Sequence, residues 1–105
     1  MTMIKTRFYF ELLALRHREE LFKEVMMPFL ITVGQSFRIA LLTDGQLDFV
    51  VKEPPFFCLT NMTLSVYLGC IKETDKDEWE ECIRDCQRVG WRTFDQEFEQ
   101  TEPNK

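Results

Sequence analysis

Residues 36–51, SFRIALLTDGQLDFVV, predict a β-hairpin that the rest of the chain can build on. Apolar and polar residues alternate on both sides of Thr43-Asp44-Gly45-Gln46, and a period of two is typical of strands. Asp-Gly favours the positive φ angles that a tight hairpin turn needs. We therefore expect the two runs to pair, with Phe37, Ile39 and Leu41 across from Leu47, Phe49 and Val51.

Two more strands are expected after the hairpin. Pro54-Pro55 removes two backbone donors and ends the second strand of the hairpin. Residues 56–60 and 63–71 then alternate around a turn at Asn61-Met62. In the second of these runs, one face is expected to hold Leu64, Val66, Leu68 and Cys70. The pattern predicts a meander of antiparallel strands.

The first 27 residues favour a strand followed by a helix. Alternation from Ile4 to Leu12 predicts a strand over residues 3–13, although the spacing of Phe8, Leu12 and Leu15 also fits part of a longer helix. The pattern then changes to a helical stripe, which predicts an amphipathic helix over residues 16–27 that ends at Pro28. The stripe consists of Leu21, Phe22, Val25, Met26 and Phe29.

A second helix is predicted over residues 75–89. Thr74 and the acidic residues after it are typical of a helix start, because carboxylates near the N-terminus interact favourably with the helix dipole. Gly90 suits a left-handed residue at the helix end, and Trp91 can supply the hydrophobic contact that accompanies such an ending. The apolar face of this helix holds Trp79, Cys82, Ile83, Cys86 and Val89.

These elements predict an α+β fold, an antiparallel sheet of about four to five strands with two amphipathic helices packed on one face. A chain of 105 residues suits one hydrophobic core. We expect a single domain over residues 1–99 and a polar C-terminal tail over residues 100–105.

The charge is unevenly distributed. Residues 1–72 carry 8 Lys and Arg against 7 Asp and Glu, whereas residues 73–105 carry 5 against 11, and the net charge is −5. The longest basic stretch is Arg16-His17-Arg18, so direct binding of nucleic acid is disfavoured. No signal peptide and no run of about 20 apolar residues is found, so we expect a cytoplasmic protein without a membrane span. In that compartment Cys58, Cys70, Cys82 and Cys86 are expected to stay reduced.

Catalytic and metal sites are not favoured. Cys82 and Cys86 could join Cys58, Cys70 or His17 in a zinc site, but the pair shares an apolar helix face and is better explained as core. The single histidine, His17, lies between two arginines, which is a poor setting for the base of a catalytic pair. We therefore predict no enzyme activity, no cofactor and no metal.

The acidic last third of the chain is the candidate partner-binding surface. Carboxylates and aromatic residues alternate there, and aromatic anchors ringed by carboxylates suit a basic protein groove. The ordinary alternative is a solvated helix face followed by aromatics that cover the core. Residues 91–99 fit either a helix or an edge strand. The candidate residues are Asp77, Glu78, Glu81, Asp85, Trp91, Phe94, Asp95, Glu97 and Phe98.

Three functions follow, in decreasing order of support. The first is a non-catalytic modulator that binds a protein with a basic surface, for example an inhibitor that presents carboxylates where a nucleic-acid-binding machine holds phosphates. The second is a self-assembling structural subunit, such as a homodimer, joined through a sheet edge or the outward aromatics Tyr9, Phe57 and Tyr67. The third is a cryptic enzyme or zinc protein. Small size and acidity alone suggest a viral accessory protein, and both features are common elsewhere.

Overall fold

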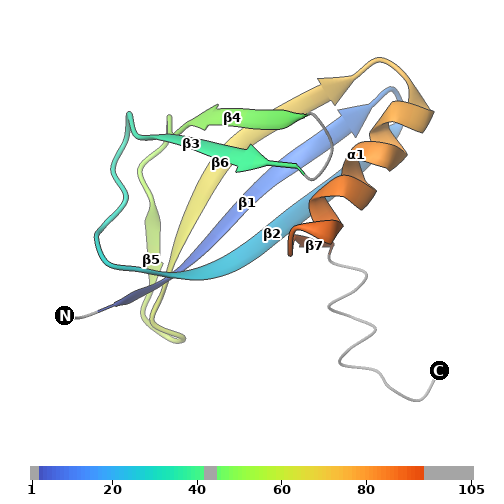
Figure 1. Cartoon of the computed structure of the whole chain (residues 1–105). Coiled ribbons are helices and arrows are strands. Elements are labelled where there is room, and N and C mark those ends of the chain that lie inside the picture. Colours follow the sequence, from blue (N-terminus) through green and yellow to red (C-terminus); the bar gives the residue numbers. More distant parts are fainter. Residues whose placement is uncertain (1–2, 42–44, 94–105) are drawn as a thin grey trace.

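The computed structural model describes residues 3–41 and 45–93, and this part of the chain forms seven strands and one helix (Figure 1). The strands are β1 (Ile4–Ala14), β2 (His17–Met27), β3 (Ser36–Ala40), β4 (Gln46–Val50), β5 (Phe56–Cys58), β6 (Thr63–Glu73) and β7 (Arg92–Thr93), and helix α1 is Lys76–Arg88. Five strands form the large sheet in the order β5-β6-β1-β2-β7, while β3 and β4 form a separate hairpin. The predicted tail at residues 100–105 lies outside the described residues.

The large sheet is mixed, so the predicted antiparallel meander is wrong. β1 pairs antiparallel with β2 along its whole length, from Ile4 opposite Met27 to Ala14 opposite His17. On its other side, β1 pairs with β6 in parallel. A parallel neighbour requires a long crossover between the two strands, and here the β3–β4 hairpin and β5 belong to that crossover.

The predicted helix over residues 16–27 is also wrong, because this segment is strand β2. Leu15 adopts a φ of 46°, and the short turn at Leu15 and Arg16 leads β1 directly into β2. Pairing with β1 satisfies the backbone of the segment, which overrides its helical spacing. Leu21 and Phe22 are both buried, yet as neighbours in a strand they lie on opposite faces of the sheet.

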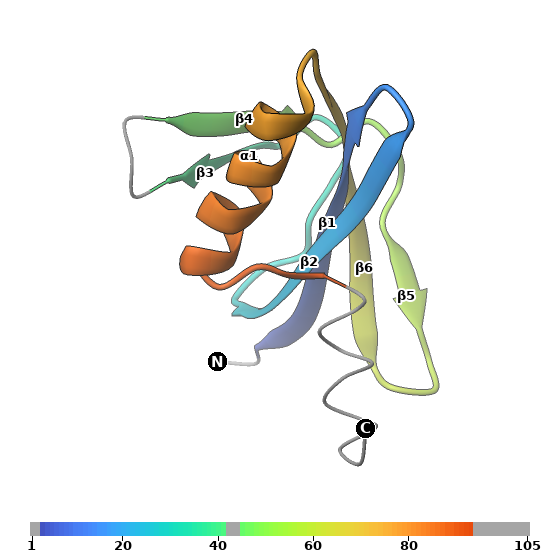
Figure 2. The same ribbon diagram turned by 90° about the vertical axis from the view of Figure 1, so that its right-hand side faces the viewer.

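Helix α1 and the β3–β4 hairpin cover the same face of the large sheet (Figure 2), so the hairpin takes the place that a second helix was predicted to fill. The core lies between these two layers. The ring of Phe10, on β1, is 5.1 Å from that of Phe49 in the hairpin and 5.0 Å from that of Trp91 after α1. The indole of Trp79 donates a 2.8 Å hydrogen bond to the carbonyl of Leu12, which fixes α1 on β1.

The ends of α1 agree closely with the predicted helix over residues 75–89. The side chain of Asp75 caps the N-terminus by accepting from the N–H of Asp77 at 2.8 Å. At the C-terminus, the N–H groups of Gly90 and Trp91 donate to the carbonyls of Gln87 and Cys86, both at 3.1 Å. This is a Schellman ending, and it requires the positive φ of 99° that Gly90 adopts.

The hairpin and β6 each depart from the pattern in one detail. β3 and β4 pair with each other as predicted, with Phe37 opposite Phe49 and Ile39 opposite Leu47. Leu41 and Val51 do not join the predicted pairing, because their N–H groups donate to the carbonyls of Gly45 and Gln35, at 3.1 and 2.9 Å. Residues 43 and 44 of the predicted turn lie outside the described residues. In β6, the pairing with β1 shifts register between Tyr67 and Gly69, and Gly69 adopts a φ of 123°. The residues after this bulge face the opposite side of the sheet from the side that simple alternation predicts. Leu68 therefore stays in the core, whereas Cys70 is exposed on the outer side.

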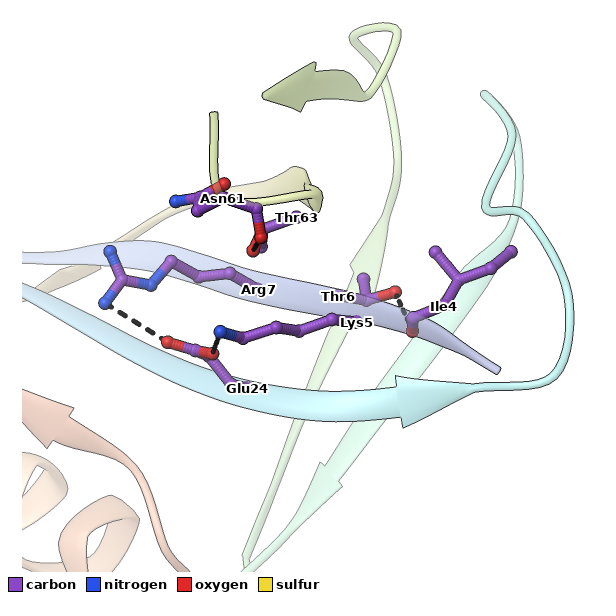
Figure 3. A network of polar contacts seen from close by, with 7 residues as sticks. All are labelled: Ile4, Lys5, Thr6, Arg7, Glu24, Asn61 and Thr63. Carbon is purple, nitrogen blue, oxygen red and sulfur yellow. Dashed lines mark hydrogen bonds and ion pairs between the residues drawn. The ribbon is translucent and has the colours of Figure 1, made fainter. Parts of the chain in front are cut away.

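The outer face of the large sheet carries paired charges and aromatic rings. Figure 3 shows Glu24 of β2 between two cations of β1, 3.3 Å from Nζ of Lys5 and 3.6 Å from Nη2 of Arg7. The Arg7 guanidinium also lies 4.2 Å from the ring centre of Phe22. Tyr9 is on this face as predicted, but Phe57 is not, because it pairs with Leu64 of the core side.

Candidate protein-binding groove

An acidic groove lies between α1 and the β3–β4 hairpin. It has a volume of about 410 Å³. Glu73 comes from the end of β6, and Glu78, Glu81 and Asp85 come from α1. The rest of the lining is Leu41, Gly45, Gln46, Leu47 and Cys82. We call these nine residues the acidic groove.

The helix and the hairpin place opposite kinds of side chain in the groove. Residues 78, 81, 82 and 85 are three or four positions apart, so α1 presents them along one side. The hairpin contributes Leu41 and Leu47, which pack partly against the core. The groove can therefore surround the methylene groups of a long side chain with apolar atoms while carboxylates contact its charge.

The carboxylates of the groove differ in how they are neutralised. Asp85 is buried, and its carboxylate forms a 2.8 Å ion pair with Nη1 of Arg88. Among the residues that the structure describes, no Lys or Arg forms an ion pair with Glu73, Glu78 or Glu81. Within the described part of the chain these three carboxylates therefore leave a local negative field that a basic ligand could balance.

Two thiols lie beneath the carboxylates. A hydrogen bond from the thiol of Cys86 lowers the pKa of Cys82, which lines the groove. The same bond, together with burial, raises the pKa of Cys86, which is enclosed in the core. The structure thus supports the interpretation of Cys86 as core.

A zinc site is not assembled. Within residues 3–41 and 45–93, no group of three His, Cys, Asp or Glu side chains is placed to hold a metal ion. Cys58 lies in β5 and Cys70 on the outer side of β6, both away from the Cys82–Cys86 pair in α1. His17 instead stacks on Trp79, with ring centres 5.1 Å apart.

The predicted site residues fall into four groups. Glu78, Glu81 and Asp85 line the acidic groove, whereas Asp77 is exposed in the first turn of α1 outside that lining. The prediction of Trp91 as a surface anchor is wrong, because its side chain packs in the core with 6% of its surface exposed. Four more predicted residues lie outside the described part of the chain, namely Phe94, Asp95, Glu97 and Phe98.

Sequence reasoning missed Glu73 and the hairpin side of the groove. Glu73 is the last residue of β6, and the connection at residues 74 and 75 sets its position relative to α1. Leu41 and Leu47 were assigned to a hairpin that was expected to be part of the main sheet. Only the separate docking of the hairpin beside α1 makes them part of a groove.

A tyrosine on the outer face gives a pH-dependent prediction. The hydroxyl of Tyr67 donates a 3.2 Å hydrogen bond to Glu11, and desolvation together with the nearby negative charge of Glu11 raises the pKa of Tyr67 to about 12. A pKa that is higher in the folded state than the ordinary value of 10 stabilises the fold below pH 10, and this stabilisation is lost between about pH 10 and 12. We expect the free energy of unfolding to fall over that window, as measured by urea unfolding at each pH.

The control for this prediction is Tyr67→Phe, which keeps the ring and removes the titrating group. Its free energy of unfolding should decline less between pH 10 and 12 than that of the wild-type chain. Equal declines would show that the hydrogen bond to Glu11 does not set the alkaline behaviour.

Comparisons of this chain with protein-family models, curated proteins and solved structures found no match. Within the described residues, α1 is too short and too polar to cross a membrane, and no other helix is present. The function is therefore argued from the acidic groove itself.

Proposed function

We propose that this chain is a non-catalytic protein-binding modulator that holds a basic segment of a larger protein in the acidic groove. The observation that carries the proposal is the gathering of Glu73, Glu78 and Glu81 around an apolar floor without a paired cation among the described residues. An arginine or lysine side chain suits this arrangement, because its stem is apolar and its end is charged. We propose the cytoplasm as its compartment.

The spacing of the carboxylates supports a more specific form of the proposal. Glu78 and Glu81 lie about one turn apart on one helix side, roughly 5 Å, and Glu73 at the end of β6 adds a third carboxylate to the same groove. Closely spaced negative charges resemble the phosphates of a nucleic-acid backbone. An inhibitor of a nucleic-acid-binding machine would use such charges to occupy the basic surface of its target.

The direct test measures binding of a fluorescently labelled poly-arginine peptide by anisotropy. We expect the variant Glu73→Gln/Glu78→Gln/Glu81→Gln to bind about tenfold to hundredfold more weakly than the wild type, with a weaker dependence on salt. Glutamine keeps the size of each side chain and removes its charge. The same variants are then used in affinity purification of the tagged chain, with mass spectrometry of the retained proteins.

The matched control removes three charges elsewhere, as Glu53→Gln/Asp77→Asn/Glu80→Gln, so that the net charge changes equally. Neither Asp77 nor Glu80 lines the acidic groove. If both triple variants weaken binding to the same extent, general acidity explains the affinity and the groove is not the site. If neither variant changes binding, the proposal is wrong.

A further inference from the structure

One side of strand β6 is left without a neighbouring strand over most of its length. β6 has eleven residues, but β5 pairs only with the first three, residues 63–65 (Figure 1). Pro54 and Pro55, which precede β5, have no N–H to donate, so the pairing stops there. Among the strands that the structure describes, none pairs with this side of residues 66–73. Such an open edge is where another strand can add to a sheet.

The open edge of β6 lies in a groove with a volume of about 230 Å³. Five consecutive residues of the strand, 67–71, line this groove. Successive side chains of a strand point to opposite faces of the sheet, so a cavity over one face would be lined by every second residue. Contact with five residues in a row therefore places the groove beside the backbone of β6. We call the ten lining residues the edge groove: Asp48, Phe49, Val50, Lys52, Glu53, Tyr67, Leu68, Gly69, Cys70 and Ile71.

Gly69 leaves the backbone of this edge accessible. A Cβ atom built on Gly69 would meet no atom within 4 Å, so open space lies where a side chain would stand. A glycine inside a strand is typical of a bulge or of a place where another backbone approaches closely. Gly69 lies at the bulge of β6 and in the middle of the five residues of β6 that line the edge groove. Both features leave room for a second chain beside β6.

The far wall of the edge groove consists of β4 residues together with Lys52 and Glu53. β4 belongs to the other sheet, and no backbone hydrogen bond joins residues 51–53 to β6. The edge of β6 therefore faces this wall across the groove. In a second copy the edge of β6 faces an identical wall, and the two walls would meet before the two edges could pair. A single extended segment avoids that clash.

The side chains of the edge groove indicate which segment fits. Asp48 is paired with Arg38 at 2.7 Å, and Lys52 and Glu53 carry opposite charges. These charges cancel, so the edge groove favours an uncharged segment, in contrast to the acidic groove. Its apolar lining consists of Phe49, Val50, Leu68 and Ile71.

We propose that an extended, uncharged segment of a partner protein binds in the edge groove and joins the large sheet as a strand beside residues 67–71. The backbone of the segment pairs with β6, and its apolar side chains, at alternate positions, contact the apolar lining of the groove. Main-chain hydrogen bonds supply the affinity in this mode of binding, and the side-chain contacts supply the specificity. The proposal is independent of what the acidic groove binds.

The test selects heptapeptides from a random display library on the full chain. Only peptides that also bind the variant Glu73→Gln/Glu78→Gln/Glu81→Gln are kept, which removes ligands of the acidic groove. We expect the tightest of them to have apolar residues at alternate positions. When about nine-tenths of the chain is bound, amide hydrogen exchange within residues 67–71 should be about tenfold slower. A library that yields no such peptide, or a peptide that leaves this exchange unchanged, would overturn the proposal and leave the function of the acidic groove standing.

Methylation of the peptide nitrogens separates backbone pairing from side-chain contact. Two versions of the selected peptide are made, each with methyl groups on every second backbone nitrogen, in opposite phase. The version whose methylated nitrogens face β6 should bind at least about tenfold more weakly, because it loses the donors that pair with the strand. The other version should bind nearly as well as the parent peptide. Equal affinities of the two versions would show that the peptide does not bind as a strand.

A matched pair of variants places the binding in the edge groove. Val50→Asp puts a charge where the bound segment would bury it, so affinity for the peptide should fall at least about tenfold. The control is Val33→Asp, because Val33 exposes 53% of its surface and lies outside the groove lining. This control should bind as the wild type does, and thermal unfolding checks that both variants fold. Equal weakening by both variants would contradict the proposal.

Two further measurements identify other occupants of the edge groove. If a synthetic peptide of residues 94–105 displaces the selected peptide, the occupant is the C-terminal segment of the chain itself and the proposal is wrong. If the wild type is a dimer at about 100 μM that the selected peptide dissociates, the occupant is a second copy and the proposal is again wrong. A monomer that binds the selected peptide and not residues 94–105 supports the proposal.

Discussion

Replacing Trp91 with alanine is expected to lower the free energy of unfolding by about 3–5 kcal/mol. Trp91 is buried, and its ring packs edge-on against Phe10 at 5.0 Å, so the truncation leaves a cavity between α1 and the large sheet. The backbone N–H of Trp91, which the alanine variant keeps, bonds the carbonyl of Cys86 at the C-terminus of α1, so the expected loss comes from the side chain. Urea unfolding followed by circular dichroism measures the loss.

The conservative variant Trp91→Phe is the control, because it keeps an aromatic ring in the same space. It should lose clearly less stability than the alanine variant. If Trp91→Ala instead leaves the free energy of unfolding unchanged and weakens binding of the poly-arginine peptide, Trp91 is a surface anchor. That result would restore the interpretation of Trp91 as a partner-binding residue.

Replacing Phe22 with alanine is expected to lower the free energy of unfolding by about 3–4 kcal/mol, although Phe22 lies on the outer face of the sheet. Phe22 is 1% exposed, and two guanidinium groups lie against its ring, Arg7 at 4.2 Å and Arg92 at 5.2 Å from the ring centre. The variant removes both cation–π contacts as well as the buried ring. Thermal and urea unfolding at a fixed protein concentration measure the effect.

Phe56 supplies the matched control for Phe22. Phe56 and Phe22 line one pocket on the outer side of the sheet, yet 71% of the surface of Phe56 is exposed. Phe56→Ala should therefore change the free energy of unfolding by only about 0.5 kcal/mol. If the two alanine variants lose the same stability, the arginines do not bury Phe22 in solution.

The helix α1 and the β3–β4 hairpin were predictable because their signals are local. Thr74 with the acidic residues after it, Gly90 and the apolar stripe between them specify a helix without reference to the rest of the chain, although the N-cap is Asp75 and not Thr74. The alternation on both sides of Asp44-Gly45 likewise indicates that two strands pair, whereas their register, with Phe37 opposite Phe49 and Ile39 opposite Leu47, came from the structure. Three candidate site residues followed from the helix alone, namely Glu78, Glu81 and Asp85.

β2 was misread because neither of its faces is uniformly apolar. On the core side Leu21 alternates with Lys23, whose Nζ donates a 2.8 Å hydrogen bond to the carbonyl of Val89 at the end of α1. On the outer side Phe22 lies among charged residues that cover it. Because charged and apolar side chains alternate along each face of β2, the period of two that is typical of a strand is hidden. The apolar residues that remain are spaced as on one side of a helix.

The sequence by itself determined the locally coded parts of this protein: the strand from Ile4, the hairpin around residue 45, the helix with its caps and the acidic character of that helix. Backbone propensities, capping groups and turn residues act over a few positions, so they can be read without a fold. The tertiary structure alone decided that residues 17–27 pair with β1, that β6 is parallel and that Trp91 is core. It also decided which residues form the acidic groove, because the groove depends on contacts between segments distant in sequence, and long-range pairing can override local preference.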